Sequence, residues 1–135
     1  AIKKAIALNK PDKKNGIDIL SKIGGFEIGG LVGVILAGAS HKIPVVIDGF
    51  ISGAAALLAY TLQPTVAEYM IASHCSVEQG HNVILKYLGL KPVLDLNLRL
   101  GEGTGAALGM NIVDAGCKIL VEMATFENAG VSKKL

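Results

Sequence analysis

The sequence predicts an α/β fold in which a parallel sheet carries helices on both faces, a three-layer Rossmann-like arrangement. Two observations lead to this prediction. Helical and strand-like segments alternate along the chain, in the order helix, strand, helix, strand, helix, strand, helix. Each strand-like segment is mostly apolar and ends in polar residues or glycines, as expected where the carboxyl ends of parallel strands form a ligand crevice.

The first part of the chain predicts three helices before any strand. Short helices are expected at 2–8 and 17–23, and Gly24-Gly25 ends the second of them. A longer apolar helix is expected at 26–39, although each internal glycine costs about 1 kcal/mol relative to alanine. Such a helix is stable only where it packs tightly. Glu27 falls in its first turn, where a negative charge suits the helix dipole.

The middle of the chain predicts two strand–helix units. The expected elements are a strand at 43–47 that ends in Asp48-Gly49, a helix at 51–62, a strand at 69–72 that ends in segment 73–76, and a helix at 77–88. The last helix is well signalled, because Ser76 and Gln79 have the spacing of a capping box and Gly89 follows its end.

The final strand is expected at 93–100, where leucines alternate with polar residues and one face is therefore buried. A glycine-rich loop follows, and a helix is expected from about Thr104. Asn111 and Asp114 could cap a further helix beyond it.

Composition suggests a piece of a larger unit. Of the 135 residues, 51% are hydrophobic and only 18% are charged, which is apolar for a free-standing soluble domain. The chain starts without methionine, in what resembles a helix already under way. We therefore expect residues 1–135 to be the C-terminal part of a single larger α/β domain, packed against an absent segment or a second copy.

Charge and cysteine usage argue against several other classes. The net charge is +2 and the aromatic residues are few and scattered, so no basic surface for nucleic acid is predicted. The longest uncharged run, 49–67, contains glycine and proline, which favours a buried helix over a membrane span. Cys75 and Cys117 lack zinc-ligand spacing, which predicts free thiols in a reducing, cytoplasmic compartment and no metal site.

The loop GEGTG, after the last predicted strand, is the strongest candidate site. Gly101, Gly103 and Gly105 allow sharp turns and close approach of the backbone to a ligand. Thr104 could cap the next helix and expose amide groups that bind phosphate. The spacing matches neither GxGxxG nor a P-loop, so a tight turn without any ligand stays open as an alternative.

Glu102 lies between two of these glycines, and two roles are open for it. Its carboxylate could complement the helix dipole. Alternatively, beside leucines such as Leu98 and Leu100, it would be partly desolvated and would act as a proton acceptor while a phosphate binds the neighbouring amides.

Other polar residues near the strand ends have less specific readings. Arg99 could pair with Asp95, with Glu102 or with a ligand, and a structural ion pair is the favoured reading. His74 at a strand end is a candidate ligand, whereas His81 is expected to pack or to form a hydrogen bond. A Ser-His-Asp hydrolase is not indicated, because the sequence has no GxSxG motif.

Four segments in order, IPVVIDGFIS, SHCSVEQGH, LRLGEGTGA and EMATFENAGVS, carry a family resemblance. Over about residues 1–132 the chain resembles the C-terminal part of the nicotinate-nucleotide:dimethylbenzimidazole phosphoribosyltransferases, which act in lower-ligand assembly of cobalamin. Family chains are more than twice as long, and their earlier half carries a further glycine-rich segment that resembles GIGNTT and much of the benzimidazole pocket. The resemblance therefore implies an incomplete active site, and the isolated chain is expected to be inactive.

The resemblance implies that phosphoribose passes from nicotinate mononucleotide to 5,6-dimethylbenzimidazole, giving α-ribazole 5′-phosphate and nicotinate, with no metal and no cofactor. It implies Glu102 as the general base and a homodimer. It implies that Ser76, Gly101 and Gly103 line the phosphate site, and at the same strand ends we expect Thr104, Asp48 and Leu100 to bind substrate or phosphate as well. Two other functions stay open: a non-catalytic nucleotide-phosphate-binding or assembly module that needs a separate partner and, more remotely, a dinucleotide-dependent oxidoreductase.

Overall fold

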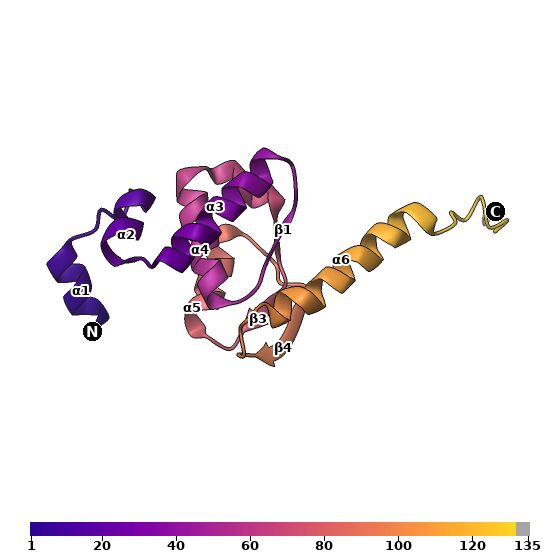
Figure 1. Ribbon diagram of the computed structural model, residues 1–135. Coiled ribbons are helices and arrows are strands. Elements are labelled where there is room, and N and C mark those ends of the chain that lie inside the picture. The colour runs from indigo at the N-terminus through magenta and orange to yellow at the C-terminus, as the bar shows by residue number, and fades with distance from the viewer. Residues whose placement is uncertain (132–135) are drawn as a thin grey trace.

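The computed structural model describes residues 1–131 and shows an α/β chain built from helices and short strands (Figure 1). The elements in order are α1 (Ile2–Asn9), α2 (Gly16–Ile23), α3 (Phe26–Ser40), β1 (Val45–Ile47), α4 (Phe50–Leu62), the 3₁₀ helix η1 (Pro64–Tyr69), β2 (Met70–Ala72), β3 (His74–Ser76), α5 (Gln79–Leu88), β4 (Leu94–Leu98) and α6 (Thr104–Glu122). The predicted α/β class is confirmed.

The strands form two parallel pairs, β1 with β2 and β3 with β4. Ser73 connects them: its N–H donates to the carbonyl of Ile47 at 2.9 Å, and its own carbonyl accepts from the N–H of Leu94 at 2.9 Å. The segment 70–76 is therefore extended between β1 and β4. The predicted strand at 69–72 was too short, because residues 74–76 continue the extended chain instead of ending it. The described strands do not form the one continuous three-layer sheet that was expected.

The core lies between α3, α4, α5 and the sheet. Ala55, Ala56 and Ala59 of α4 are completely buried, and they pack with Ile35 of α3 and Ile47 of β1. Because alanines leave room for the backbone of a neighbouring helix, α3 and α4 pack along their length. The expected tight packing holds for only part of α3: Gly38 lies directly against Val45, whereas Gly30 and Gly33 have no atom within 4 Å of an added Cβ.

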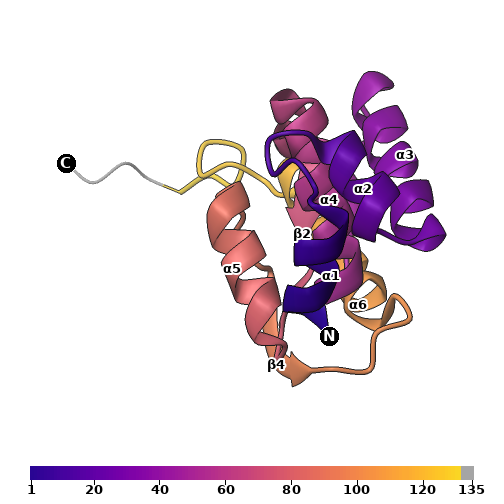
Figure 2. The ribbon, with the colours of Figure 1, turned by 90° about the vertical axis from the view of Figure 1, so that its left-hand side faces the viewer.

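The N-terminal helices lie at one end of the molecule (Figure 1). The side chain of Asn15 accepts hydrogen bonds from the N–H groups of Ile17 and Asp18, which starts α2 at Gly16. Helix α2 packs against α4, and Gly16 lies so close to Thr61 that a side chain would not fit (Figure 2). Helix α1 has no buried residue.

Helix α6 is one continuous helix, which corrects the expectation of a break near Asn111. The side-chain amide of Asn111 donates to the carbonyl of Ala107 at 2.9 Å, and Asp114 pairs with Lys118 at 2.8 Å. Both polar side chains are therefore used within the helix rather than as caps.

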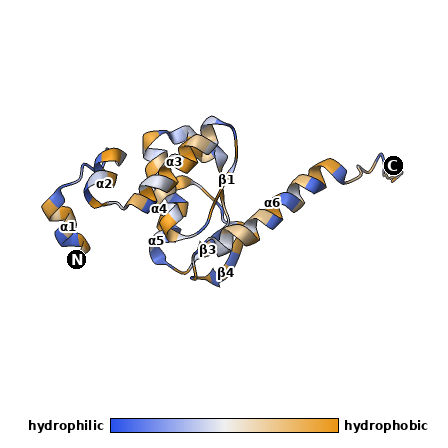
Figure 3. Cartoon of the chain, in the orientation of Figure 1, coloured by the Kyte–Doolittle hydropathy of each residue, from blue (hydrophilic) through white to orange (hydrophobic). Residues whose placement is uncertain are grey.

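Only the first turns of α6 pack against the strands, and the rest extends away from the body with apolar side chains exposed (Figure 3). Helix α6 is also long and apolar enough to cross a membrane by length and composition, and 11% of that window is buried. A single helix of this kind is weak evidence for a membrane span.

The predicted start of α5 was wrong. Ser76 is the last residue of β3, and α5 starts at Gln79 with Glu78 as its N-cap and no side-chain cap, so the capping box does not form. Instead, the hydroxyl of Ser76 accepts a hydrogen bond from the N–H of Glu78 at 3.3 Å. A 3₁₀ helix, with Pro64 in its first turn, fills the stretch between α4 and β2.

Candidate functional site

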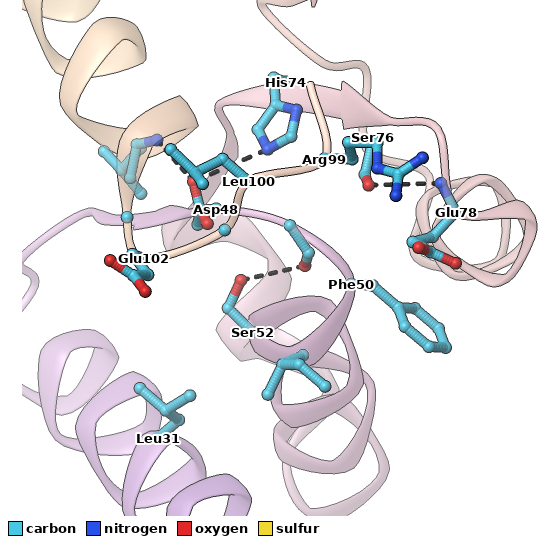
Figure 4. Close-up of a pocket in the computed structure, with 16 residues that line it drawn as sticks. Leu31, Asp48, Phe50, Ser52, His74, Ser76, Glu78, Arg99, Leu100 and Glu102 are labelled. Atoms are coloured by element: carbon cyan, nitrogen blue, oxygen red, sulfur yellow. Dashed lines mark hydrogen bonds and ion pairs between the residues drawn. The ribbon is translucent and has the colours of Figure 1, made fainter. Parts of the chain in front are cut away.

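A cavity of about 600 Å³ lies at the carboxyl ends of β1, β3 and β4 (Figure 4). This is the edge at which the sequence predicted a ligand crevice. The predicted site residues that line the cavity are Asp48, Ser76, Leu100, Gly101, Glu102 and Gly103. Thr104 is the predicted site residue that does not line it. Segments far apart in the sequence are thus brought together around one space.

The glycine loop turns sharply through three successive left-handed residues. Gly101, Glu102 and Gly103 have φ angles of 81°, 56° and 76°. Glycine adopts this region freely, but Glu102 does so at a cost of about 1 kcal/mol. Gly103 is the N-cap of α6 and makes no side-chain cap bond, so the expected capping role of Thr104 was wrong. The N–H of Thr104 donates instead to the carbonyl of Gly101 at 3.1 Å.

Asp48 takes the place that was expected for a phosphate at the start of α6. Its Oδ1 atom accepts a hydrogen bond from the N–H of Ala106 at 2.9 Å. A carboxylate at a helix N-terminus is favoured by the helix dipole, and it satisfies one of the free amides of the first turn. Because Asp48 follows β1 directly, this bond fixes the end of β1 against the start of α6.

His74 is buried beneath this contact. Its Nε2 atom lies 3.7 Å from Oδ1 of Asp48, and its side chain is 4% exposed. The ring fills the space beside Gly105, where a Cβ atom would overlap it. Among residues 1–131 its Nδ1 atom has no hydrogen-bond partner. The structure places this predicted ligand candidate in the wall of the cavity, where it also supports Asp48 and α6.

Glu102 lines the cavity but is exposed within residues 1–131, so these residues do not supply the desolvation that was expected. Its carboxylate points to the side of the cavity that faces Leu31 of α3 (Figure 4). The side chain thus lies at an open mouth, where a ligand or another segment could cover it.

Arg99 also lines the cavity (Figure 4). The expected ion pair with Asp95 or Glu102 is not present among the described residues, since the ion pairs there join other side chains. The correction has a geometric reason: Arg99 lies beyond β4, which ends at Leu98, and it lines the cavity instead. Glu27 lies in the first turn of α3, as predicted.

A family model described as phosphoribosyltransferase matches residues 1–131. The chain belongs to this phosphoribosyltransferase family. It is 60% identical over 134 residues to the nicotinate-nucleotide–dimethylbenzimidazole phosphoribosyltransferase of Roseiflexus sp. (strain RS-1), covering 99% of this chain and 38% of that protein. The protein of the same name from Desulforudis audaxviator (strain MP104C) is 61% identical over 132 residues, which cover 98% of this chain and 37% of the relative.

Solved structures of this phosphoribosyltransferase family agree with the sequence relatives. The crystal structure of CobT from Thermus thermophilus superposes with a TM-score of 0.91 and 40% identity, over 98% of this chain and 39% of that one. A second crystal structure, of nicotinate-nucleotide-dimethylbenzimidazole phosphoribosyltransferase from the same organism, superposes with a TM-score of 0.85 and 43% identity. That match covers 89% of this chain and 36% of the other. The family resemblance predicted from the four motifs is confirmed. The chain spans about two fifths of the length of these relatives.

Several residues of the phosphoribosyltransferase cavity were not singled out from the sequence. Leu31, Phe50 and Glu78 line it, from α3, the start of α4 and the turn before α5. Phe50 could have been found, because it follows Asp48-Gly49 at a predicted strand end. Leu31 carries no such signal, since its place depends on how α3 packs. Among the described residues, no three His, Cys, Asp or Glu side chains gather as metal ligands.

Proposed function

We propose that this chain supplies the general base and part of the phosphate site of a nicotinate-nucleotide:dimethylbenzimidazole phosphoribosyltransferase. The observation that carries the proposal is the convergence of Glu102, Ser76 and the glycine loop on one cavity, in a chain of this family. The reaction would transfer phosphoribose from nicotinate mononucleotide to 5,6-dimethylbenzimidazole and give α-ribazole 5′-phosphate and nicotinate.

The chemistry suits a single carboxylate. Nicotinate leaves from a cationic pyridinium, so it takes the electrons of the broken C–N bond as a neutral ring nitrogen and needs no acid. One nitrogen of the benzimidazole attacks the sugar carbon, and the N–H of the other becomes acidic as the new bond forms. Glu102 accepts that proton, a transfer that contributes about 10²–10⁴-fold to the rate when the base is well placed. The exposed mouth around Glu102 leaves room for the flat ring.

The anion would be held away from the first turn of α6. Asp48 already occupies the N–H of Ala106, and its negative charge would repel a phosphate there. Ser76, Gly101 and Arg99 line the same cavity, and they offer a hydroxyl, backbone N–H groups and a guanidinium. We propose that these groups bind the phosphate, since Arg99 offers several donors in a fork that suits phosphate oxygens. Different parts of one cavity then bind the benzimidazole ring, beside Glu102, and the phosphate.

The relatives are longer than this chain, so we propose that the remaining walls of the site come from sequence outside the match. In the whole protein the two strand pairs would belong to a larger three-layer parallel sheet, and the whole protein would be a homodimer. The exposed apolar side chains of α6, such as Leu120 and Val121, support a further packing partner.

The test is a chimera in which this chain replaces the matching 134 residues of the Roseiflexus relative. We expect the chimera to form α-ribazole 5′-phosphate, and Glu102→Gln to lower kcat by at least about 100-fold while nucleotide affinity stays within a few-fold. Glu78→Gln is the matched control, because Glu78 is another exposed glutamate that lines the same cavity. Equal kcat values for the two variants would exclude Glu102 as the base.

The alternative function, a non-catalytic binding module, makes a different prediction for the same chimera. Calorimetry would then show binding of nicotinate mononucleotide, while chromatography of the products would show no turnover. The isolated chain, assayed in parallel, would reveal whether the described cavity binds the nucleotide by itself.

A further inference from the structure

His81 is a buried polar residue that the proposed reaction leaves unused. It lies in the first turns of α5, is 0% exposed and does not line the cavity. Its ring packs against Gly53 of α4, where a Cβ atom would come within 3.0 Å of Cδ2. The ring centroid of His74 lies 5.9 Å away. A polar ring held this tightly needs a hydrogen bond that justifies its burial.

That hydrogen bond reaches the end of strand β3. The backbone N–H of Ser76 donates to the ring atom Nδ1 of His81 at 3.1 Å. The backbone N–H of His81 donates to the carbonyl of Glu78 at 2.9 Å. The N–H of Glu78 in turn donates to the hydroxyl of Ser76 at 3.3 Å. Three hydrogen bonds thus close the turn between β3 and α5, and they replace the side-chain cap that α5 lacks.

The closed turn dictates what Ser76 offers to the cavity. Its backbone N–H is taken by His81, and an acceptor position of its hydroxyl oxygen is taken by Glu78. The hydroxyl hydrogen remains, and Ser76 lines the cavity. Ser76 is therefore set up as a donor to an anionic oxygen, such as a phosphate oxygen.

We propose that His81 is a positioning residue for the phosphate-binding hydroxyl of Ser76, acting as a neutral imidazole that accepts the Ser76 N–H. This inference rests on the proposed function, because it concerns how the same site holds the phosphate of its substrate. His81 does not touch the substrate, and it acts through the turn that joins Ser76 to α5.

The neutral form is required by the geometry, since a protonated Nδ1 would point its hydrogen at the N–H of Ser76. Burial lowers the pKa of His81, the nearby His74 lowers it further, and the charge of Asp48 opposes the shift. His74 comes from β3 and Asp48 from the end of β1, whereas α4 presents the uncharged Gly53. The ring is thus neutral at pH 7, and it takes up a proton only below its ordinary value of 6.5.

Two substitutions separate positioning from simple packing. His81→Asn keeps an acceptor, because an asparagine Oδ1 lies at about the place of a histidine Nδ1, whereas His81→Leu fills the space without one. In the active chimera we expect His81→Leu to raise KM for nicotinate mononucleotide by about three- to tenfold with kcat little changed, the effect of one lost hydrogen bond. His81→Asn should restore most of the affinity. His41→Asn, in an exposed histidine at the end of α3, is the control.

The pH profile gives a further readout that packing would not move. As the pH falls below 6.5, the parent should lose more affinity for the nucleotide than His81→Asn does, because the nucleotide phosphate takes up a proton at about pH 6 in both experiments whereas asparagine does not titrate. If His81 had a purely structural role, His81→Leu and His81→Asn would both lose stability and would leave KM unchanged. The proposal would be overturned by equal KM values for the parent and His81→Leu, or by equal losses of nucleotide affinity in His81→Leu and His81→Asn.

Nitrogen-15 NMR of the chain tests the hydrogen bond from the Ser76 N–H to His81 without requiring turnover. A chimera without turnover would count against the proposed function and not against this hydrogen bond. At pH 7 Nδ1 of His81 should give the shift of an unprotonated acceptor and Nε2 that of a protonated nitrogen. Inorganic phosphate titrated into the same sample should move the Ser76 amide signal in His81→Asn and less so in His81→Leu. A protonated Nδ1 at pH 7, or identical titrations in both variants, would refute the positioning role.

Discussion

Gly105→Ala tests the junction that holds the cavity together. A Cβ atom at Gly105 would overlap the imidazole of His74, lying 2.7 Å from its Cγ atom as well. The ring has little room to retreat, because its side chain is 4% exposed and its Nε2 atom lies 3.7 Å from Oδ1 of Asp48. The helix and the buried ring must therefore move apart.

The magnitude follows from two opposing effects. Alanine favours a helix interior over glycine by about 1 kcal/mol, which stabilises the variant. Overpacking in a closed core costs about 1–3 kcal/mol, and the direct overlap with a rigid ring places this case near the upper end. The net expectation is a loss of about 2 kcal/mol in the free energy of unfolding.

Gly116→Ala is the matched control, because Gly116 lies on the same helix with nothing within 4 Å of an added Cβ. It should gain up to about 1 kcal/mol from helix propensity alone. Urea unfolding, followed by circular dichroism with unchanged m-values, measures both variants. If Gly105→Ala is as stable as Gly116→Ala, the tight contact with His74 does not exist. The double variant with His74→Ala should recover much of the loss, since it removes the overlapping ring.

Two further expectations concern charged groups. Asp48→Ala should lower the free energy of unfolding by about 1 kcal/mol and speed hydrogen exchange in the first turn of α6, whereas Asp48→Asn, which keeps an acceptor, should lose less. The N–H of Asp12 and then Lys22 hold the pKa of Asp18 below 3.8, so its stabilisation is present above pH 3.8 and is lost as the pH falls through the lower folded value. The loss of stability on acid titration should be smaller in Asp18→Asn than in the parent; equal losses in the two proteins would refute this.

The accuracy of the sequence-based predictions followed the range of the interactions involved. Helix α2 depends on Asn15 and the glycine pair after it, and α5 ends at Gly89, so both were predicted to within a few residues. The break expected near Asn111 was wrong, because its side chain bonds back to Ala107 once the helix exists. The predicted capping box was wrong because Ser76 belongs to β3, where it pairs with Leu98 of β4, and is therefore not the N-cap of α5.

In the candidate site, the residues at the strand ends were predictable from the sequence and their hydrogen-bond partners were not. The polar strand ends placed Asp48, Ser76 and the glycine loop around one crevice, since parallel strands bring their carboxyl ends to one edge. The partners of those residues were not predictable. The bond from Ala106 to Asp48 spans 58 positions, and His81 reaches Ser76 only because the turn before α5 closes.

By itself the sequence determined the α/β class, the helix and strand order, the family, and the residue types that gather at the strand ends. These depend on apolar periodicity, local chain breakers and motif spacing, which are properties of neighbouring residues. Only the tertiary structure decided that Asp48 accepts a hydrogen bond at the start of α6, that Arg99 lines the cavity and that His81 accepts the N–H of Ser76. Hydrogen bonds between distant segments form only after the backbone is packed, so no local pattern encodes them.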